Sequence, residues 1–325
     1  GPPKAPYAPP VDPEMPAAVA HVALVAAGTA RPLRARHVAG VLVAATAHAW
    51  LSVKDVPVAA VATSIVLWPL VAGRRWLALA TTGLVGAASS AAYLIVHQRV
   101  YGGWTVYAAG DHFATAGEFA VVGNDPDYAG RSRRLIGLLV DRRYGLVPWA
   151  PVWILVPPAV AWMLVARVRH RRVIAAVMAT GWLMATFVAF TMHGWWSPGR
   201  QLVVISPLAA IAVAVLVDRF RRLAWPTVAL GAIGACNWIW LAVESSTGRR
   251  TIIVDFAETA AFPYRAVEWL FAPGVPTNPV GDRALIAWTA VAVLGMWWVV
   301  GRMRSSVRST ADRAPVTGDQ VKASR

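Results

Sequence analysis

Long apolar blocks, separated by short clusters of arginine, make up most of this chain. A segment must stay apolar for about 17 to 25 residues to cross the hydrocarbon core of a bilayer, and it crosses as a helix because unpaired backbone groups are costly in lipid. A soluble helix would alternate apolar and polar faces every 3.6 residues, and these blocks mostly lack that alternation. We therefore expect an all-α, polytopic integral membrane protein.

Nine blocks are long and apolar enough to be candidate transmembrane helices. They cover residues 15–30, 37–51, 56–72, 76–96, 146–166, 173–192, 202–217, 224–243 and 284–301. Two long loops, 97–145 and 244–283, are each expected to carry a short helix lying in the membrane interface. The transmembrane domain then covers residues 1–301, followed by a disordered basic tail over 302–325.

The arginines are distributed unevenly between alternate loops. One set of loops contains fifteen arginines and the single acid Asp218, whereas the other set contains thirteen basic and thirteen acidic residues. Because basic residues favour the cytoplasmic side, we expect a multi-pass plasma-membrane protein with its N-terminus outside and its C-terminus inside. The same distribution explains the net charge of +15 without a nucleic-acid partner.

Two smaller features bound the interpretation. The one cysteine, Cys236, lies within an apolar block, so we expect a buried structural thiol and neither an internal disulfide nor a cysteine-based metal site. The chain opens with Gly1-Pro2-Pro3-Lys4 and shows no signal-peptide pattern, so we expect a fragment that lacks an upstream segment.

Carboxylates stand just before the first apolar block. Asp12 and Glu14 flank Pro13, and one interpretation is ordinary stabilisation of a helix N-terminus. The functional interpretation is a pair of catalytic carboxylates that face a cavity on the extracytoplasmic side.

Basic residues in three outer loops are candidate ligands for a lipid phosphate. Lys54 either binds such a phosphate or forms a surface ion pair with Asp55. Arg142 and Arg143 are suited to bidentate phosphate binding, although arginines at a membrane surface also anchor to lipid head groups. Tyr144 follows them as a candidate sugar or lipid contact.

The segment from His193 to Arg200 combines a titratable imidazole, flexible glycines and a guanidinium. Trp195 and Trp196 within it can stack on a sugar ring or form part of an aromatic belt. We interpret His193 and Arg200 as donor-phosphate ligands and the two tryptophans as sugar or lipid contacts.

Metal binding has little support in the sequence. Asn124-Asp125-Pro126-Asp127 clusters the oxygen ligands that divalent cations prefer, but Asx-Pro turns of this kind are common in loops. We expect no metal site and no cofactor.

Three patches resemble the later part of a polytopic glycosyltransferase of the GT-C superfamily, which includes protein mannosyltransferases and actinobacterial arabinosyl- and mannosyltransferases. The patches are Asp12 to Pro16 with Trp50 to Pro57, Asp141 to Pro151, and Gly194 to Pro207. The resemblance implies sugar transfer from a polyprenyl-phosphate donor to an acceptor on the extracytoplasmic face. In that superfamily the principal catalytic carboxylate lies in the first outer loop, and this chain contains no matching segment.

The resulting hypothesis is a membrane glycosyltransferase, or part of one, with membrane lipid and a polyprenyl-phosphate sugar as partners. A transporter or flippase is the alternative, but the helix interiors hold few ionisable residues, chiefly His21 and His48, which counts against ion coupling. A non-catalytic membrane scaffold is the third interpretation.

Overall fold

The computed structural model describes residues 14–30, 34–104, 127–188, 198–249, 256–273 and 279–311, with the side chains of 53, 279–282 and 302–311 left undescribed. The described residues are predominantly helical and contain no strand, which confirms the all-α prediction.

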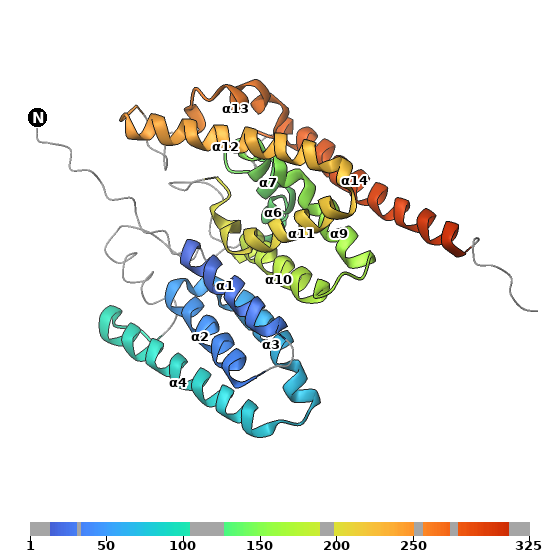
Figure 1. Ribbon diagram of the computed structural model, residues 1–325. Helices are drawn as coiled ribbons and strands as arrows, with labels where there is room; N and C mark the ends of the chain where they lie inside the picture. The colour runs from blue at the N-terminus through green and yellow to red at the C-terminus, as the bar shows by residue number, and fades with distance from the viewer. Residues whose placement is uncertain are drawn as a thin grey trace, which may run out of the picture.

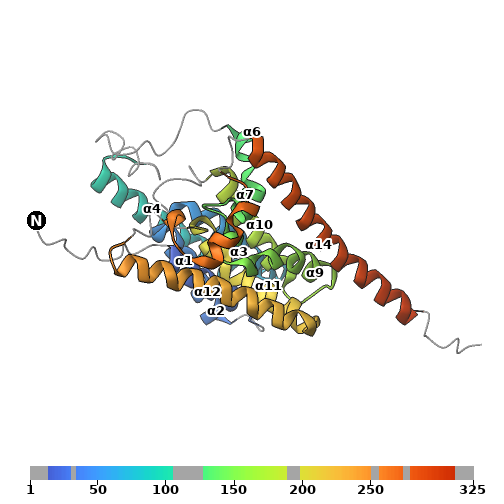
Figure 2. The same ribbon diagram turned by 90° about the horizontal axis from the view of Figure 1, so that it is seen from above.

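The first part of the chain forms four helices that pack against one another. They are α1 (Glu14–Thr29), α2 (Ala35–Leu51), α3 (Val56–Ala72) and α4 (Trp76–Tyr101), with the short 3₁₀ helix η1 (Val53–Asp55) between α2 and α3. In both views α4 lies at the outside edge of this group, against α2 and α3 (Figures 1 and 2).

The middle of the chain consists of short, broken helices. These are α6 (Tyr128–Arg131), α7 (Arg134–Val140), α8 (Leu146–Trp149), η2 (Pro151–Leu155), α9 (Val156–Val165), α10 (Arg171–Leu183), the π-helix η3 (Met184–Val188), η4 (Arg200–Ile205) and α11 (Ser206–Arg219).

The remaining chain forms two long helices with a small helical cap between them. The elements are η5 (Arg221–Leu223), α12 (Ala224–Ser246), η6 (Phe256–Glu258), α13 (Phe262–Val267), η7 (Glu268–Leu270) and α14 (Pro279–Ala311). Helix α14 extends away from the body on the side opposite α4 (Figures 1 and 2).

Five helical segments in the described chain are long and apolar enough to cross a membrane, so the predicted count of nine is not confirmed. They cover Trp76–Tyr101, Arg171–Val188, Arg200–Arg219, Arg221–Ser246 and Arg283–Gly301. Helices α1, α2 and α3 have only 16 or 17 residues. The predicted span 146–166 is broken into α8, η2 and α9, because prolines at 148, 151, 157 and 158 cannot donate backbone hydrogen bonds.

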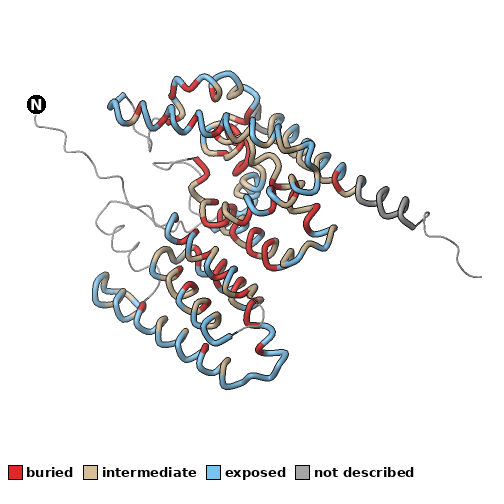
Figure 3. Tube along the Cα trace, viewed as in Figure 1, coloured by how far each residue is buried: buried red, intermediate tan, exposed pale blue. Residues whose placement is uncertain are grey.

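The helices of the core meet through small residues. Buried Ala59, Ala62 and Ala212 lie in the main hydrophobic cluster, and Gly28 of α1 faces Val66 of α3. Lipid tails are as apolar as leucine, so membrane helices associate mainly by the close packing that such residues allow. Burial is concentrated on α1 to α3 and α9 to α11, whereas α4, α12 and α14 are largely exposed (Figure 3).

The expectation of a buried Cys236 is wrong. The thiol is exposed on α12. Only 17% of the most apolar stretch of this helix is buried, because α12 contacts the body along one narrow face. Within that face, the amide of Asn237 donates to the carbonyl oxygens of Trp149 at 3.1 Å and Pro148 at 3.5 Å. Non-helical backbone at membrane depth is tolerated where another helix satisfies it in this way.

We expect Gly28→Ala to lower stability by about 1–3 kcal/mol, the usual cost of overpacking. A Cβ atom at Gly28 would overlap the two methyl groups of Val66, whose β-branched side chain has little rotamer freedom. Unfolding in detergent by added sodium dodecyl sulfate measures the loss. Gly83→Ala on α4 is the matched control, since nothing lies within 4 Å of a Cβ there; equal losses in both variants would contradict the packing argument.

Candidate functional site

A buried cluster of charges joins three segments that are distant in the sequence. Glu14 begins α1, Lys54 lies in η1, and Arg200 begins η4. We call the end of the bundle that carries these residues the outer end, because the arginine clusters that the sequence analysis places on the cytoplasmic side lie at the opposite ends of the helices.

Glu14 is the centre of this cluster. Its side chain is only 2% exposed, and its Oε1 accepts from Lys54 Nζ at 2.5 Å and from Arg200 Nε at 2.9 Å. Arg200 Nη2 also donates to Glu14 Oε2 at 3.3 Å, so the guanidinium is hydrogen-bonded to both carboxylate oxygens. Bidentate binding of this kind is the geometry that arginine and carboxylate favour most.

The two cations keep some contact with solvent. The side chains of Lys54 and Arg200 are 28% and 19% exposed, in contrast to the buried carboxylate. Lys54 Nζ also donates to Gln201 Oε1 at 3.3 Å, which links η1 to η4 a second time. The cluster therefore presents positive groups outward and covers its negative charge.

Asp55 adds a second carboxylate that lacks full hydrogen bonding. It is 6% exposed, and within the described chain its Oδ2 is buried without a partner. Burial raises the pKa of Asp55 to about 6; the charge of Lys54 opposes this rise and the charge of Glu14 adds to it. Near neutral pH such a carboxyl group can accept and release a proton.

A small cavity lies beside Asp55. Lys54, Gln201 and residues of α3, α10, η3 and η4 line it, and its volume of about 20 Å³ is enough for one water molecule. The π-helix η3 contributes Met184 and Ala185 to the lining. Single-turn π-helical segments are frequent at functional sites, because they displace side chains from the regular helical positions.

A tight turn brings Arg142, Arg143 and Tyr144 to the same end. Asp141 is fully buried, and its Oδ1 accepts from the backbone N–H groups of Arg143 at 2.9 Å and Tyr144 at 2.8 Å. The backbone N–H of Gly199 donates to Tyr144 O at 3.1 Å, so the turn lies directly beside the start of η4.

The structure uses the two arginines differently. Arg142 Nε donates to Glu268 O at 2.9 Å and Nη2 to Phe271 O at 3.5 Å, which ties the turn to the cap of α13 and η7. Arg143 is exposed, and its backbone O accepts from Trp149 Nε1 at 2.8 Å. Arg142 is thus committed to holding the loop, whereas Arg143 presents its guanidinium outward.

Several predicted site residues lie outside the described residues, namely Asp12, His193, Trp195 and Trp196. Glu14, Lys54 and Arg200 are brought into one cluster. Tyr144 is half-buried, with its ring edge against Phe256 at a centroid distance of 5.4 Å.

Asp55 and a buried histidine pair are the residues that the sequence reasoning did not place in a site. His21 Nδ1 lies 3.3 Å from His48 Nε2, both rings are fully buried, and His48 Nδ1 is 2.7 Å from Ala44 O. Since a carbonyl can only accept, His48 carries its proton on Nδ1 and His21 donates to its Nε2. That tautomer leaves His21 Nε2 as a buried acceptor, and it has no hydrogen-bond partner in the described chain.

No metal cluster is formed by the described part of the chain. In those residues, no three His, Cys, Asp or Glu side chains lie close enough together to hold a metal ion. The Asn124 to Asp127 segment lies outside the described residues up to position 126.

We expect Glu14→Gln to destabilise the protein by about 2–3 kcal/mol. This loss is somewhat smaller than the cost of breaking a fully buried ion pair, because Lys54 and Arg200 reach solvent. In a double-mutant cycle with Lys54→Met, the coupling energy should exceed about 1 kcal/mol. Detergent unfolding of the four proteins measures it.

The matched control is Asp218→Asn, which breaks the exposed Asp218–Arg221 pair and should cost about 0.5 kcal/mol or less. A coupling energy near zero for Glu14 and Lys54 would show that the cluster does not hold these segments together.

Comparison of the chain with protein-family models, with curated proteins and with solved structures gave no match.

Proposed function

We propose that this protein is a membrane glycosyltransferase, or part of one, that moves a sugar from a polyprenyl-phosphate donor to an acceptor hydroxyl at the outer end of the bundle. The observation that carries the proposal is the placement of Asp55, a buried carboxyl group with a partnerless oxygen and a raised pKa, beside Lys54, which Glu14 joins to a second partly exposed cation, Arg200.

Such a reaction needs a base for the acceptor hydroxyl and cations for the leaving phosphate. A base must take the proton of the acceptor hydroxyl as that oxygen attacks the anomeric carbon. The bond from the anomeric carbon to the phosphate oxygen breaks at the same time, and the leaving polyprenyl phosphate needs cations to stabilise its charge. Asp55 supports the first role through the one water molecule for which its cavity has room, because a base can act through a single intervening water. Lys54 and Arg200 support the second role.

The geometry leads us to assign the base role to Asp55 rather than Glu14. The Glu14 carboxylate accepts hydrogen bonds from Lys54 and from Nε and Nη2 of Arg200, so its charge is compensated and its oxygens are occupied. Glu14 is then a positioning residue that holds the two cations toward the donor phosphate. Arg143, exposed in the turn next to η4, is a further candidate for the same phosphate.

Transfer of a radiolabelled sugar from polyprenyl phosphate tests the proposal. We expect Asp55→Asn to reduce the rate by about 10²–10⁴-fold, the usual contribution of a general base. For the wild type the rate should rise with pH through about 6, because only deprotonated Asp55 accepts a proton.

Stability provides the control for the same variant. Because the pKa of Asp55 is higher in the folded protein than in the unfolded chain, the protein loses stability as the pH rises from the unfolded pKa toward 6. Asp55→Asn should therefore be as stable as the wild type or more stable at pH 7. No transfer from any polyprenyl-phosphate sugar by the wild type would overturn the proposal, as would full activity in Asp55→Asn.

A proton-coupled transporter is the second candidate, and the histidine pair of α1 and α2 is the observation that favours it. Ionisable groups within membrane helices usually serve transport or proton transfer. His21 Nε2 is a buried acceptor without a hydrogen-bond partner in the described residues, and the other ring nitrogen of His21 is hydrogen-bonded to His48.

The two functions differ in what His21→Gln should do. Transport coupled to protons predicts that proton uptake into proteoliposomes is lost, with His97→Gln on α4 as the control. Sugar transfer predicts that His21→Gln changes the transfer rate by less than about twofold while Asp55→Asn abolishes it.

A further inference from the structure

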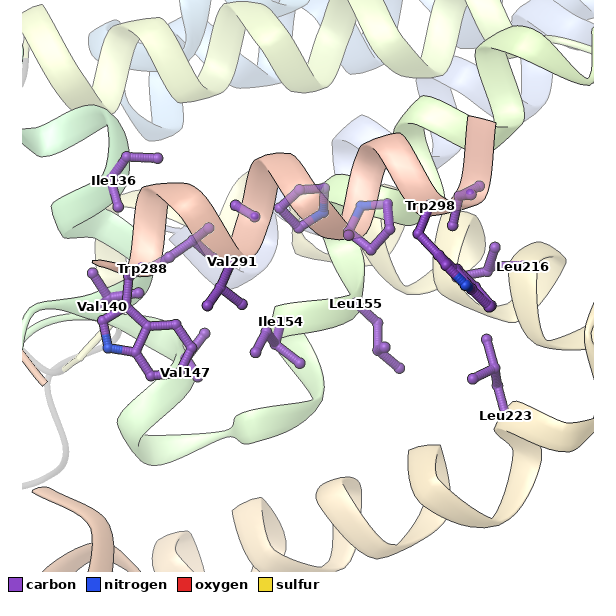
Figure 4. A pocket seen from close by; sticks show the side chains of 16 residues that line it. Ile136, Val140, Val147, Ile154, Leu155, Leu216, Leu223, Trp288, Val291 and Trp298 are labelled. Carbon is purple, nitrogen blue, oxygen red and sulfur yellow. The ribbon is translucent and has the colours of Figure 1, made fainter. Parts of the chain in front are cut away.

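An apolar groove runs along α14 on the side of the molecule opposite α4. It has a volume of about 270 Å³, and it is lined by residues of α7, α8, η2, α9, α11, η5 and α14. Figure 4 shows Trp288, Val291 and Trp298 of α14 facing Ile154 and Leu155 of η2 and Leu223 of η5. Every lining residue is apolar, so the groove is suited to hydrocarbon rather than to a sugar or an ion.

The groove has the length of one leaflet. Trp288 and Trp298 line its two ends and are separated by ~15 Å along α14 at the helical rise per residue. The hydrocarbon core of a bilayer is ~30 Å thick, so this distance is about half of it and matches the extent of one acyl chain.

The end with Trp298 opens beside a cluster of arginines. Leu216 and Leu223 line this end, and Arg219, Arg221 and Arg222 lie between them in the sequence, all exposed. Arg221 is paired with Asp218, and the guanidinium of Arg219 lies 5.6 Å from the ring centre of Phe220. Arg222 makes no hydrogen bond or ion pair within the residues described.

Aromatic side chains mark the same level. Phe220 contacts both Trp162 and Trp298, with ring centroids 6.1 and 6.4 Å apart. Tryptophan is enriched where a membrane helix leaves the hydrocarbon region, so Trp298 places the mouth of the groove near the head-group level.

We propose that this groove binds one acyl chain of an anionic phospholipid from the leaflet at the arginine-rich end, with the lipid phosphate bound by Arg219 and Arg222. Basic pockets between membrane helices recognise anionic head groups, and the groove beneath this one supplies a chain-length apolar surface. The site is separate from the outer-end cluster and does not depend on the proposed transferase activity.

Gly295 is a position where a larger side chain can fill the groove without disturbing the fold. It lines the groove, and nothing lies within 4 Å of a Cβ built there. Gly295→Leu therefore places a branched side chain in the space that the acyl chain would occupy. Gly86→Leu on α4 is the matched control, since a Cβ at that position also meets nothing within 4 Å.

Native mass spectrometry of the purified full chain, titrated with phosphatidylglycerol or phosphatidylcholine of identical acyl chains, tests the proposal. The wild type should retain one phosphatidylglycerol at least fivefold more tightly than phosphatidylcholine. Gly295→Leu should weaken that binding about tenfold, and Gly86→Leu should leave it unchanged.

The head-group contact has its own pair of variants. Arg219→Gln with Arg222→Gln should abolish the preference for phosphatidylglycerol, whereas Arg74→Gln with Arg75→Gln, an equal loss of charge in the turn between α3 and α4, should preserve it. Equal binding of the two lipids by the wild type, or equal loss in both arginine pairs, would overturn the proposal. Tighter binding of polyprenyl phosphate, displaced by Gly295→Leu, would overturn it in favour of a different occupant.

Discussion

The outer end depends on one buried carboxylate held between two cations. Glu14 connects the first helix to a loop forty residues later and to a segment near position 200, and these contacts cross the bundle at a point where regular helix packing has ended. A buried ion pair adds little net stability compared with an apolar contact, but it costs much when one partner is missing. Its effect here is on position, because the carboxylate and both cations are paired where α1, η1 and η4 meet.

The same arrangement determines the properties of Asp55. Its neighbour in the chain, Lys54, points its ammonium group toward Glu14, so Asp55 remains buried without the full stabilisation of a direct ion pair. Desolvation then dominates over the charge of Lys54 and raises the pKa. Two carboxylates in one cluster thus acquire different properties, one compensated and one available for proton transfer.

The helical class and the five segments that are long and apolar enough to cross a membrane were predictable from local sequence, because apolar blocks are properties of contiguous residues. The predicted count of nine spans is not confirmed, since five segments of the described chain are long and apolar enough to cross a membrane. Prolines divide the block at 146–166, and the exposure of Cys236 reflects how little of α12 the rest of the chain covers. Neither effect is visible in composition alone, since both depend on which helices become neighbours.

The site shows the same division. The charged character of Glu14, Lys54 and Arg200 and their position at helix ends could be predicted, and their convergence follows only from the packing of α1 against η4. Arg142 has the residue type expected of a phosphate ligand, yet its guanidinium binds two carbonyl oxygens of the η7 region. An arginine beside an irregular loop serves either the loop or a ligand, and the sequence does not distinguish them. Asp55 shows the converse: its signal was adjacency to Lys54, and its importance comes from a cavity lined by residues of five separate elements.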